Sequence, residues 1–232
     1  MEDVSRKSSF KVSIIVPCKE IDAYAQRCIR RCKFLYPQAE LLIIPDSVVP
    51  GYPAAKRNFA MSIAKGNVFA FIDSDAYPSE NWLEKALIWL ELHPAVCGPG
   101  VLPPDAPIEE RISDVVYQML PYAERVVQMT QRILPEYPTF NLIVRKEFAA
   151  PFENFLTGED SLFCRRIKEG IFYHPEILVY HNRRPAFKKL WKQIGTYGRH
   201  RGNFLKRAIA AWVSSIFVYT FNFILGFLKR RP

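Results

Sequence analysis

Short apolar segments alternate with amphipathic segments over the first 101 residues, and this alternation limits the possible folds more than any other feature of the sequence. Each apolar segment ends at turn residues and predicts a buried strand. The amphipathic segments repeat apolar residues with helical spacing. The expected strands are residues 12–16, 41–44, 67–72 and 95–101, and the expected helices are residues 22–34, 53–64 and 79–92. This order predicts an α/β fold with a mostly parallel sheet and helices on both of its faces.

Local signals predict the helix ends and the elements that follow. Asp22 and Ser79 are the expected N-caps of the first and third helices, and Pro53 suits the first turn of the second. Further on, the patterns predict a strand at 141–145, a helix at 159–169 and short strands at 172–174 and 177–181. Residues 103–139 contain six prolines and a helix-like segment at 109–120, and we expect this stretch to form a mobile cover.

The charge is distributed unevenly along the chain. The net charge is +9 overall, but residues 1–182 hold 20 Lys and Arg against 23 Asp and Glu, a net charge of −3. Residues 183–232 hold 12 Lys and Arg and no acidic residue. A slightly acidic body fits nucleic acid poorly, so we expect no nucleic-acid partner. The five cysteines form no CxxC pair, which favours free thiols in a reducing compartment over a disulfide framework or a zinc knuckle.

An uncharged apolar run at residues 208–228 follows the basic stretch. About 20 apolar residues span a bilayer, so we expect a membrane helix, either spanning or deeply inserted. A buried core helix and a helix lying in the membrane plane are the alternatives. The expected organisation is a folded domain at 1–182, a basic amphipathic juxtamembrane segment at 183–207 and the membrane helix at 208–228, with truncation after residue 232 left open. The flanking Lys and Arg favour a membrane-associated protein whose folded domain is cytoplasmic.

Two carboxylates end the third expected strand, in the segment Asp73-Ser74-Asp75. We expect both at the carboxyl edge of the sheet, where ligands bind in folds of this type. Two such groups suit Mg²⁺ or Mn²⁺ bridged to a diphosphate, so a divalent cation is the expected cofactor. An isolated pair of this kind is more often an acidic loop or a helix cap, but the apolar strand before it favours the metal site here.

Two further charged clusters lie at expected helix starts. Glu159 and Asp160 follow Gly158, where acids stabilise a helix N-terminus and where a carboxylate can also act as a general base toward an acceptor hydroxyl. Lys56 and Arg57 occupy a first turn, in which cations oppose the helix dipole. They therefore need an anionic partner such as phosphate, unless both are simply solvated.

In order and spacing, these segments resemble glycosyltransferase family 2. The resemblance rests on residues 12–17, 46, 54–58, 73–75 and 158–160, and it extends over about residues 11–202. It implies the GT-A fold and an inverting transfer from a nucleotide-diphosphate sugar. The chain departs from the family at Asp46, where many relatives have consecutive acids, and at residues 150–155, where relatives often have a Gly-Gly-Phe turn.

The resemblance implies a role for each matched position. Asp160 would be the catalytic base with Glu159 beside it, and Asn141 would lie near the acceptor. The implied metal ligands are Asp73, Asp75 and His181, with a structural role for His181 as the alternative. The implied donor-binding residues are Pro17, Glu20, Asp46, Lys56, Arg57, Asp73 and Asp75. The positions similar to elements that hold donor or lipid phosphate are Arg183, Arg184, Gln193, Arg199 and Arg201, although a solvated cationic face also explains them.

We therefore expect a metal-dependent inverting glycosyltransferase. It would move a sugar from a nucleotide-diphosphate donor to a hydroxyl or phosphate of a lipid-linked or membrane-proximal acceptor, at an anionic membrane surface. A sugar nucleotidyltransferase is one alternative, but it normally has a glycine-rich loop after the first strand, where this chain has Pro17-Cys18-Lys19-Glu20. A membrane-recruited binding module for nucleotide sugars, without turnover, is the other.

Overall fold

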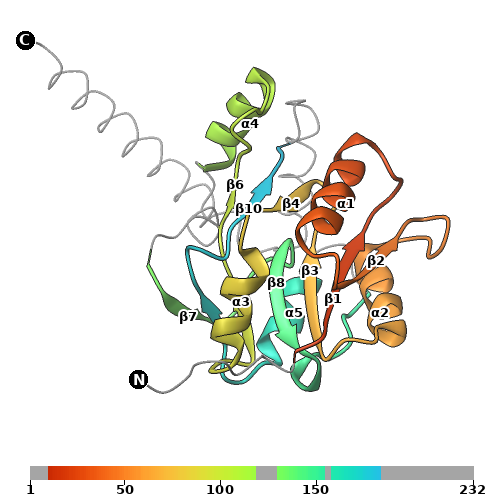
Figure 1. Ribbon diagram of the computed structural model, residues 1–232, viewed down its shortest axis with the longest axis vertical. Helices are drawn as coiled ribbons and strands as arrows, with labels where there is room; N and C mark the ends of the chain where they lie inside the picture. The colour runs from red at the N-terminus through yellow and green to blue at the C-terminus, as the bar shows by residue number, and fades with distance from the viewer. Residues whose placement is uncertain (1–9, 119–129, 155–157, 184–232) are drawn as a thin grey trace, which may run out of the picture. The chain divides into compact units, whose positions relative to one another are not determined.

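The computed structural model describes residues 10–118, 130–154 and 158–183 of the chain (Figure 1). The chain divides into two compact units, residues 1–103 with 126–182 and residues 104–125 with 183–232. Both sheets described below belong to the first unit. Whether a domain ends at residue 182, as expected from the sequence, stays a prediction.

A seven-stranded sheet runs through the first unit in the order β2-β1-β3-β8-β5-β9-β7. Its strands are β1 (Val12–Pro17), β2 (Glu40–Ile44), β3 (Val68–Ile72), β5 (Ala95–Cys97), β7 (Arg132–Leu134), β8 (Asn141–Arg145) and β9 (Ile171–Tyr173). The described helices of this unit are α1 (Ala23–Leu35), α2 (Pro53–Ile63), α3 (Trp82–Leu90) and α5 (Glu159–Arg165), with a 3-10 turn at Lys146–Phe148. The fold is therefore of the α/β class that the sequence predicts.

The sheet is mixed, with two strands running against the others. β1 pairs in parallel with β2 and β3, and β5 pairs in parallel with β9. β8 lies between β3 and β5 and runs antiparallel to both, while β7 runs antiparallel to β9. The apolar pattern of β8 predicts a buried strand correctly. It carries no information on strand direction, because that depends on where the preceding chain crosses the sheet.

A second sheet contains three short strands, β4 (Ala76–Pro78), β10 (Val179–His181) and β6 (Gly100–Val101), in the order β4-β10-β6. The single strand expected at 95–101 is thus two strands in different sheets, separated at Gly98 and Pro99. The sequence does not predict β4, which begins directly after Asp75. Pairing of β4 with β10 sets Ala76 opposite His181, so the end of β10 lies next to the carboxylates that follow β3.

The helix ends agree with the sequence-based predictions at α1 and differ from them at α3 and α5. Asp22 caps α1, as expected, by accepting a hydrogen bond from the Ala25 N–H at 2.9 Å. The prediction that Ser79 caps α3 is wrong, because the N-cap is Asn81 in a left-handed conformation with φ 60°. The Ser79 N–H instead donates to the carbonyl oxygen of Leu178, so this residue ties the chain after β4 to the segment before β10. Helix α5 ends at Arg165, four residues earlier than expected.

The core is centred on β3, every residue of which is buried. Phe71 from this strand packs edge-on against Phe152 and Phe163, with ring centroids 5.3 and 5.8 Å away. Phe152 and Phe163 stack on each other at 4.1 Å. Since Phe163 lies in α5, this aromatic cluster holds α5 against the sheet at a fixed position.

Helix α4 (Ile108–Gln118) dominates the described part of the second unit, and it confirms the helix expected at 109–120 with slightly different ends. Arg111 secures its start by donating to the carbonyl oxygens of Ala106 and Pro104, at 2.9 and 2.8 Å. A covering role for residues 103–139 stays a prediction. None of the described helices has the length and hydropathy to cross a membrane. The membrane helix expected at 208–228 lies outside the described residues.

Close backbone packing at Gly98 predicts that Gly98→Ala is strongly destabilising. A Cβ atom there would overlap the carbonyl oxygen of Ile177 and lie 2.6 Å from that of His174. We expect a loss of about 3 kcal/mol in the free energy of unfolding, measured by urea denaturation. Gly51→Ala is the control, because a Cβ atom at position 51 meets no atom within 4 Å. Only the backbone φ of 107° causes strain there, and we expect it to lower the free energy of unfolding by about 1–2 kcal/mol. Equal losses in the two variants would contradict the crowding at Gly98.

Candidate active site

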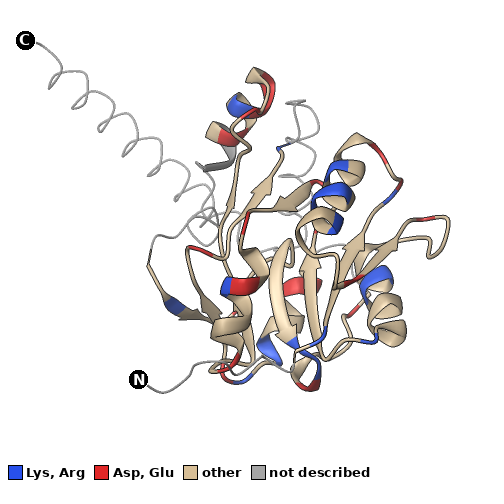
Figure 2. Cartoon of the chain, viewed as in Figure 1, with Lys and Arg blue, Asp and Glu red and all other residues tan. Residues whose placement is uncertain are grey.

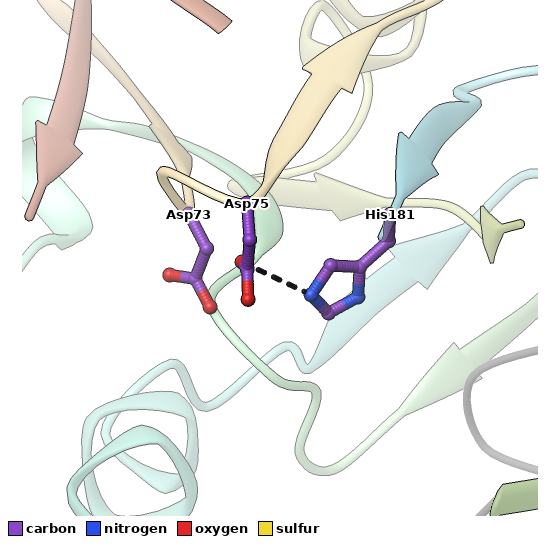
Figure 3. Close-up of side chains that lie close together, drawn as sticks. All are labelled: Asp73, Asp75 and His181. Carbon is purple, nitrogen blue, oxygen red and sulfur yellow. Dashed lines mark ion pairs between the residues drawn. The ribbon is translucent and has the colours of Figure 1, made fainter. Parts of the chain in front are cut away.

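The carboxylates that follow β3 meet a histidine from the second sheet (Figure 3). Asp73 and Asp75 lie between β3 and β4, and His181 is the last residue of β10. One ligand atom from each of the three residues lies within 4.8 Å of the other two. His181 Nε2 is 3.2 Å from Asp75 Oδ1. The fold thus brings together the three residues that the sequence nominates as metal ligands.

This donor set fits a divalent cation. Carboxylate oxygens suit Mg²⁺ and Mn²⁺, and an imidazole nitrogen suits transition-metal ions. Three protein ligands leave coordination positions for phosphate oxygens and water. Burial and the like charge of Asp75 raise the pKa of Asp73, against the opposing effect of Arg57, and a cation between the two carboxylates would relieve this repulsion.

Two neighbours of the cluster hold its side chains in place. Asn182 donates from both its backbone N–H and its side-chain amide to the carbonyl oxygen of Asp75, at 2.9 and 3.0 Å. The Phe140 ring stacks on the His181 imidazole at 4.8 Å. These contacts fix the turn that carries Asp75 and the plane of the histidine ring. The sequence did not single out either residue, although Asn182 directly follows His181.

Arg57 of α2 lies buried among acidic side chains, with 3% of its surface exposed. One terminal nitrogen donates to Asp73 Oδ1 at 2.9 Å. The other lies 3.4 Å from Glu159 Oε1 and 3.7 Å from Asp160 Oδ1. The guanidinium group therefore sits between the acids that follow β3 and the acids that begin α5.

Glu159 and Asp160 differ in their surroundings. Burial and the neighbouring Asp160 raise the pKa of Glu159 to about 8, although Arg57 opposes this shift. Glu159 therefore holds a proton at neutral pH. The side chain of Asp160 is 28% exposed, and its Oδ2 accepts a hydrogen bond from the Thr139 N–H at 3.2 Å. Of the two acids, Asp160 is the more exposed to solvent.

Lys56 finds its anionic partner within the protein. Its Nζ is 2.5 Å from Asp46 Oδ1 and donates to the carbonyl oxygen of Gly51 at 2.7 Å. The Lys56 side chain is 4% exposed and that of Asp46 is 38% exposed. The ion pair anchors the loop after β2 to the first turn of α2, and leaves Asp46 as the partner open to solvent.

Asn141, expected near the acceptor, lies in the protein interior at the start of β8. Its Oδ1 accepts a hydrogen bond from Trp82 Nε1 at 2.8 Å, and its amide donates to the carbonyl oxygens of Gly98 and Ile177, at 2.8 and 2.7 Å. These bonds tie together α3, the chain between β5 and β6, and the segment before β10. A contact with an acceptor stays a prediction for this residue.

The remaining predicted site residues are more scattered. Pro17 is buried at the end of β1, and Glu20 is exposed in the loop before α1. Arg183 belongs to the second unit, where its Nε donates to Asp114 Oδ1 at 2.6 Å and its backbone N–H donates to Glu110 Oε2 at 3.0 Å. The other predicted phosphate-binding residues, Arg184, Gln193, Arg199 and Arg201, lie outside the described residues.

Sequence comparison finds one family model that matches part of the chain. Residues 49–150 match the model of Glycosyl transferase family 2. The match covers 102 of the 232 residues, which is less than half of the chain. The matched segment contains Lys56, Arg57, Asp73, Asp75 and Asn141, while Asp160 and His181 join the site through the fold. No curated protein sequence matches the chain.

Solved structures with the same fold include known glycosyltransferase proteins. A197 from STIV superimposes with a TM-score of 0.51 at 14% identity, over 75% of this chain and 87% of that one. The mannosyltransferase PcManGT from Pyrobaculum calidifontis, solved in complex with GDP-Man and Mn²⁺, superimposes with a TM-score of 0.50 at 18% identity. That match covers 74% of this chain and 56% of PcManGT. The chain thus has the GT-A fold that the sequence predicts.

The raised pKa of Glu159 predicts a pH-dependent difference in stability between the wild type and Glu159→Gln. The folded protein keeps this proton up to about pH 8, whereas an unfolded chain loses it near the ordinary glutamate pKa of about 4.3. The wild type therefore loses stability as pH rises through this window, by at most about 1.4 kcal/mol per pH unit. The variant, which imitates the protonated form, does not. In urea unfolding we expect similar stabilities at pH 5 and a more stable variant at pH 8; identical pH dependence in both proteins would refute a buried, protonated Glu159.

Proposed function

We propose that this domain transfers a sugar from a nucleotide-diphosphate donor to an acceptor hydroxyl, with a divalent cation and with inversion at the anomeric carbon. The observation that carries the proposal is the convergence of Asp73, Asp75 and His181, with ligand atoms within 4.8 Å of one another. Further support comes from the family 2 match and from PcManGT, a protein of the same fold that binds GDP-Man and Mn²⁺.

Asp73, Asp75 and His181 would hold the cation. When bound, Mg²⁺ or Mn²⁺ supplies a positive charge that offsets the negative charge of the diphosphate leaving group. The chain's own contribution is the fixed placement of the three ligands, through the pairing of β4 with β10 and the two hydrogen bonds from Asn182 to Asp75.

Asp160 is the proposed general base. It would accept the proton of the acceptor hydroxyl while the acceptor oxygen forms a bond to the anomeric carbon. The bond from that carbon to the diphosphate oxygen breaks in the same step, and its electron pair leaves with the nucleotide diphosphate. A single displacement of this kind inverts the anomeric centre. Glu159, already protonated at neutral pH because of its raised pKa, is the less suitable base.

Asp46 is the proposed contact to the nucleobase. Its pairing with Lys56 leaves its carboxylate more than a third exposed, and an aspartate oxygen can accept a hydrogen bond from a ring N–H of the base. Glu20 and Pro17, at the end of β1 and in the next loop, are proposed to border the nucleoside.

Asp75→Asn and Asp160→Asn separate metal-dependent donor binding from proton removal. With Mn²⁺ or Mg²⁺ and a panel of nucleotide sugars, the wild type should release nucleotide, and EDTA should abolish the release. Asp75→Asn should lose metal-dependent donor binding, while Asp160→Asn should bind donor normally and transfer sugar about 10²–10⁴-fold more slowly. Asp105→Asn, an exposed acid of the second unit, is the control and should match the wild type. Release that persists in EDTA, or normal transfer by Asp160→Asn, would overturn the assignment.

We also propose a lipid-linked acceptor and a position at the cytoplasmic face of a membrane. The support is the sequence of residues 183–232, with 12 cationic and no acidic residues around an uncharged apolar run. Each Lys or Arg near an anionic leaflet contributes about 1 kcal/mol of attraction.

The acceptor proposal predicts transfer to a polyprenyl phosphate or a lipid-linked sugar in vesicles that contain anionic lipid. The full chain should sediment with these vesicles, and both sedimentation and transfer should weaken as salt is raised. Vesicles of neutral lipid are the control. Efficient transfer to soluble sugars with none to the lipid acceptors would contradict the proposal.

A further inference from the structure

Arg57 is the physical connection between two parts of the site that lie far apart in the sequence. Asp73 follows β3, and Glu159 and Asp160 begin α5, more than 80 positions later. One terminal nitrogen of Arg57 binds Asp73 at 2.9 Å, and the other faces Glu159 and Asp160 at 3.4 and 3.7 Å. Under the proposed function, on which this inference rests, these are the metal-binding side and the base side.

The position of Arg57 is fixed by its surroundings. The next residue, Asn58, exchanges two hydrogen bonds with the backbone of Phe152, at 2.8 and 2.7 Å. The Phe152 ring lies 5.5 Å from the Arg57 guanidinium carbon and stacks on Phe163 of α5. Helix α2, the loop at Phe152 and helix α5 therefore form one packed assembly around the guanidinium group.

The burial of Arg57 argues against the donor contact that the sequence suggests. Its side chain is 3% exposed, and both terminal nitrogens face carboxylates of the protein. Its Nε is buried and has no hydrogen-bond partner among the described residues. A planar guanidinium can bind two separate carboxylates at once, whereas a lysine ammonium acts as a single point charge. The arrangement uses the property that distinguishes arginine from lysine.

We infer that Arg57 is a positioning residue that fixes the location of Asp160 relative to Asp73, the carboxylate proposed to bind the metal. Its two-sided contact fixes the base on the acceptor side of the metal ligands. Arg57 thereby acts on the reaction through Asp160, without touching the donor.

The division of the effect between kcat and the donor KM tests this inference with Arg57→Gln, Arg57→Lys and the control Arg165→Gln. Arg165 lies on the same helix as Asp160, but it is 66% exposed and pairs with Glu136. In Arg57→Gln, kcat should fall about 10²-fold because Asp160 is no longer held in position, while the KM for donor stays nearly unchanged. Arg57→Lys should also be slow, because one ammonium cannot bind both sides. Arg165→Gln should match the wild type.

Two results would overturn the inference. A wild-type kcat in Arg57→Gln would show that Arg57 does not position the base. A large rise in the donor KM with an unchanged kcat would make it a donor contact instead.

A measurement of stability, which does not depend on enzyme activity, tests the link between Arg57 and Asp160 independently of the proposed function. In urea unfolding at pH 7, Arg57→Gln, Asp160→Asn and the double variant form a double-mutant cycle. We expect the loss in the double variant to be smaller than the sum of the single losses, because a neutral amide at position 160 no longer needs the cation; additive losses would reject the link. If the wild type releases no nucleotide from any donor, the proposed function fails, and this cycle still decides whether Arg57 and Asp160 are coupled.

Discussion

Mutual repulsion among four carboxylates is the constraint on which the whole site depends. Asp73, Asp75, Glu159 and Asp160 converge where β3, β10 and α5 end or begin, and burying several like charges together is costly. The protein offsets this repulsion in three ways: the guanidinium of Arg57, the imidazole of His181 beside Asp75, and a proton retained on Glu159, whose raised pKa is about 8. The arrangement of the secondary structure around the site serves to hold these three compensating groups in place.

The hydrogen bonds of a buried side chain, Asn141, connect the interior of the protein to the site. Asn141 is fully buried, and its amide group satisfies Trp82 Nε1 and the carbonyl oxygens of Gly98 and Ile177. Those carbonyl groups lie beside Gly98, where the backbones approach too closely for a side chain. This junction joins the large sheet to the small one, and the small sheet carries His181. The buried amide of Asn141 thus stabilises the segment that leads into β10, the strand that ends at His181.

The sequence predicts the parts of the site that depend on local pattern. Asp73 and Asp75 were nominated because an apolar strand ends there, and Glu159 and Asp160 because a helix begins there; the fold confirms both placements. What the sequence did not predict depends on contacts between distant segments. The direction of β8, the existence of β4 and the role of Asn182 all follow from strand pairing, which leaves no periodic signal in so few residues. The sequence predicts Ser79 as the N-cap of α3, but the cap is Asn81. The Ser79 N–H donates to the carbonyl oxygen of Leu178, nearly a hundred positions away, and a local sequence pattern cannot reveal such a contact.

Lys56 and Arg57 show how a correct physical argument from sequence can lead to a different partner. Two cations in the first turn of a helix need anions, and the sequence suggested the phosphates of a donor. In the fold, Asp46 neutralises Lys56, and Asp73 with the acids of α5 neutralises Arg57. Figure 2 shows where the cationic and acidic positions lie along the ribbon. Both cations are paired with acidic side chains of the protein. Under the proposed function, a donor beside Asp73 and Asp75 would bring negative charge to a place that is already acidic, and a divalent cation held by Asp73, Asp75 and His181 would compensate for it.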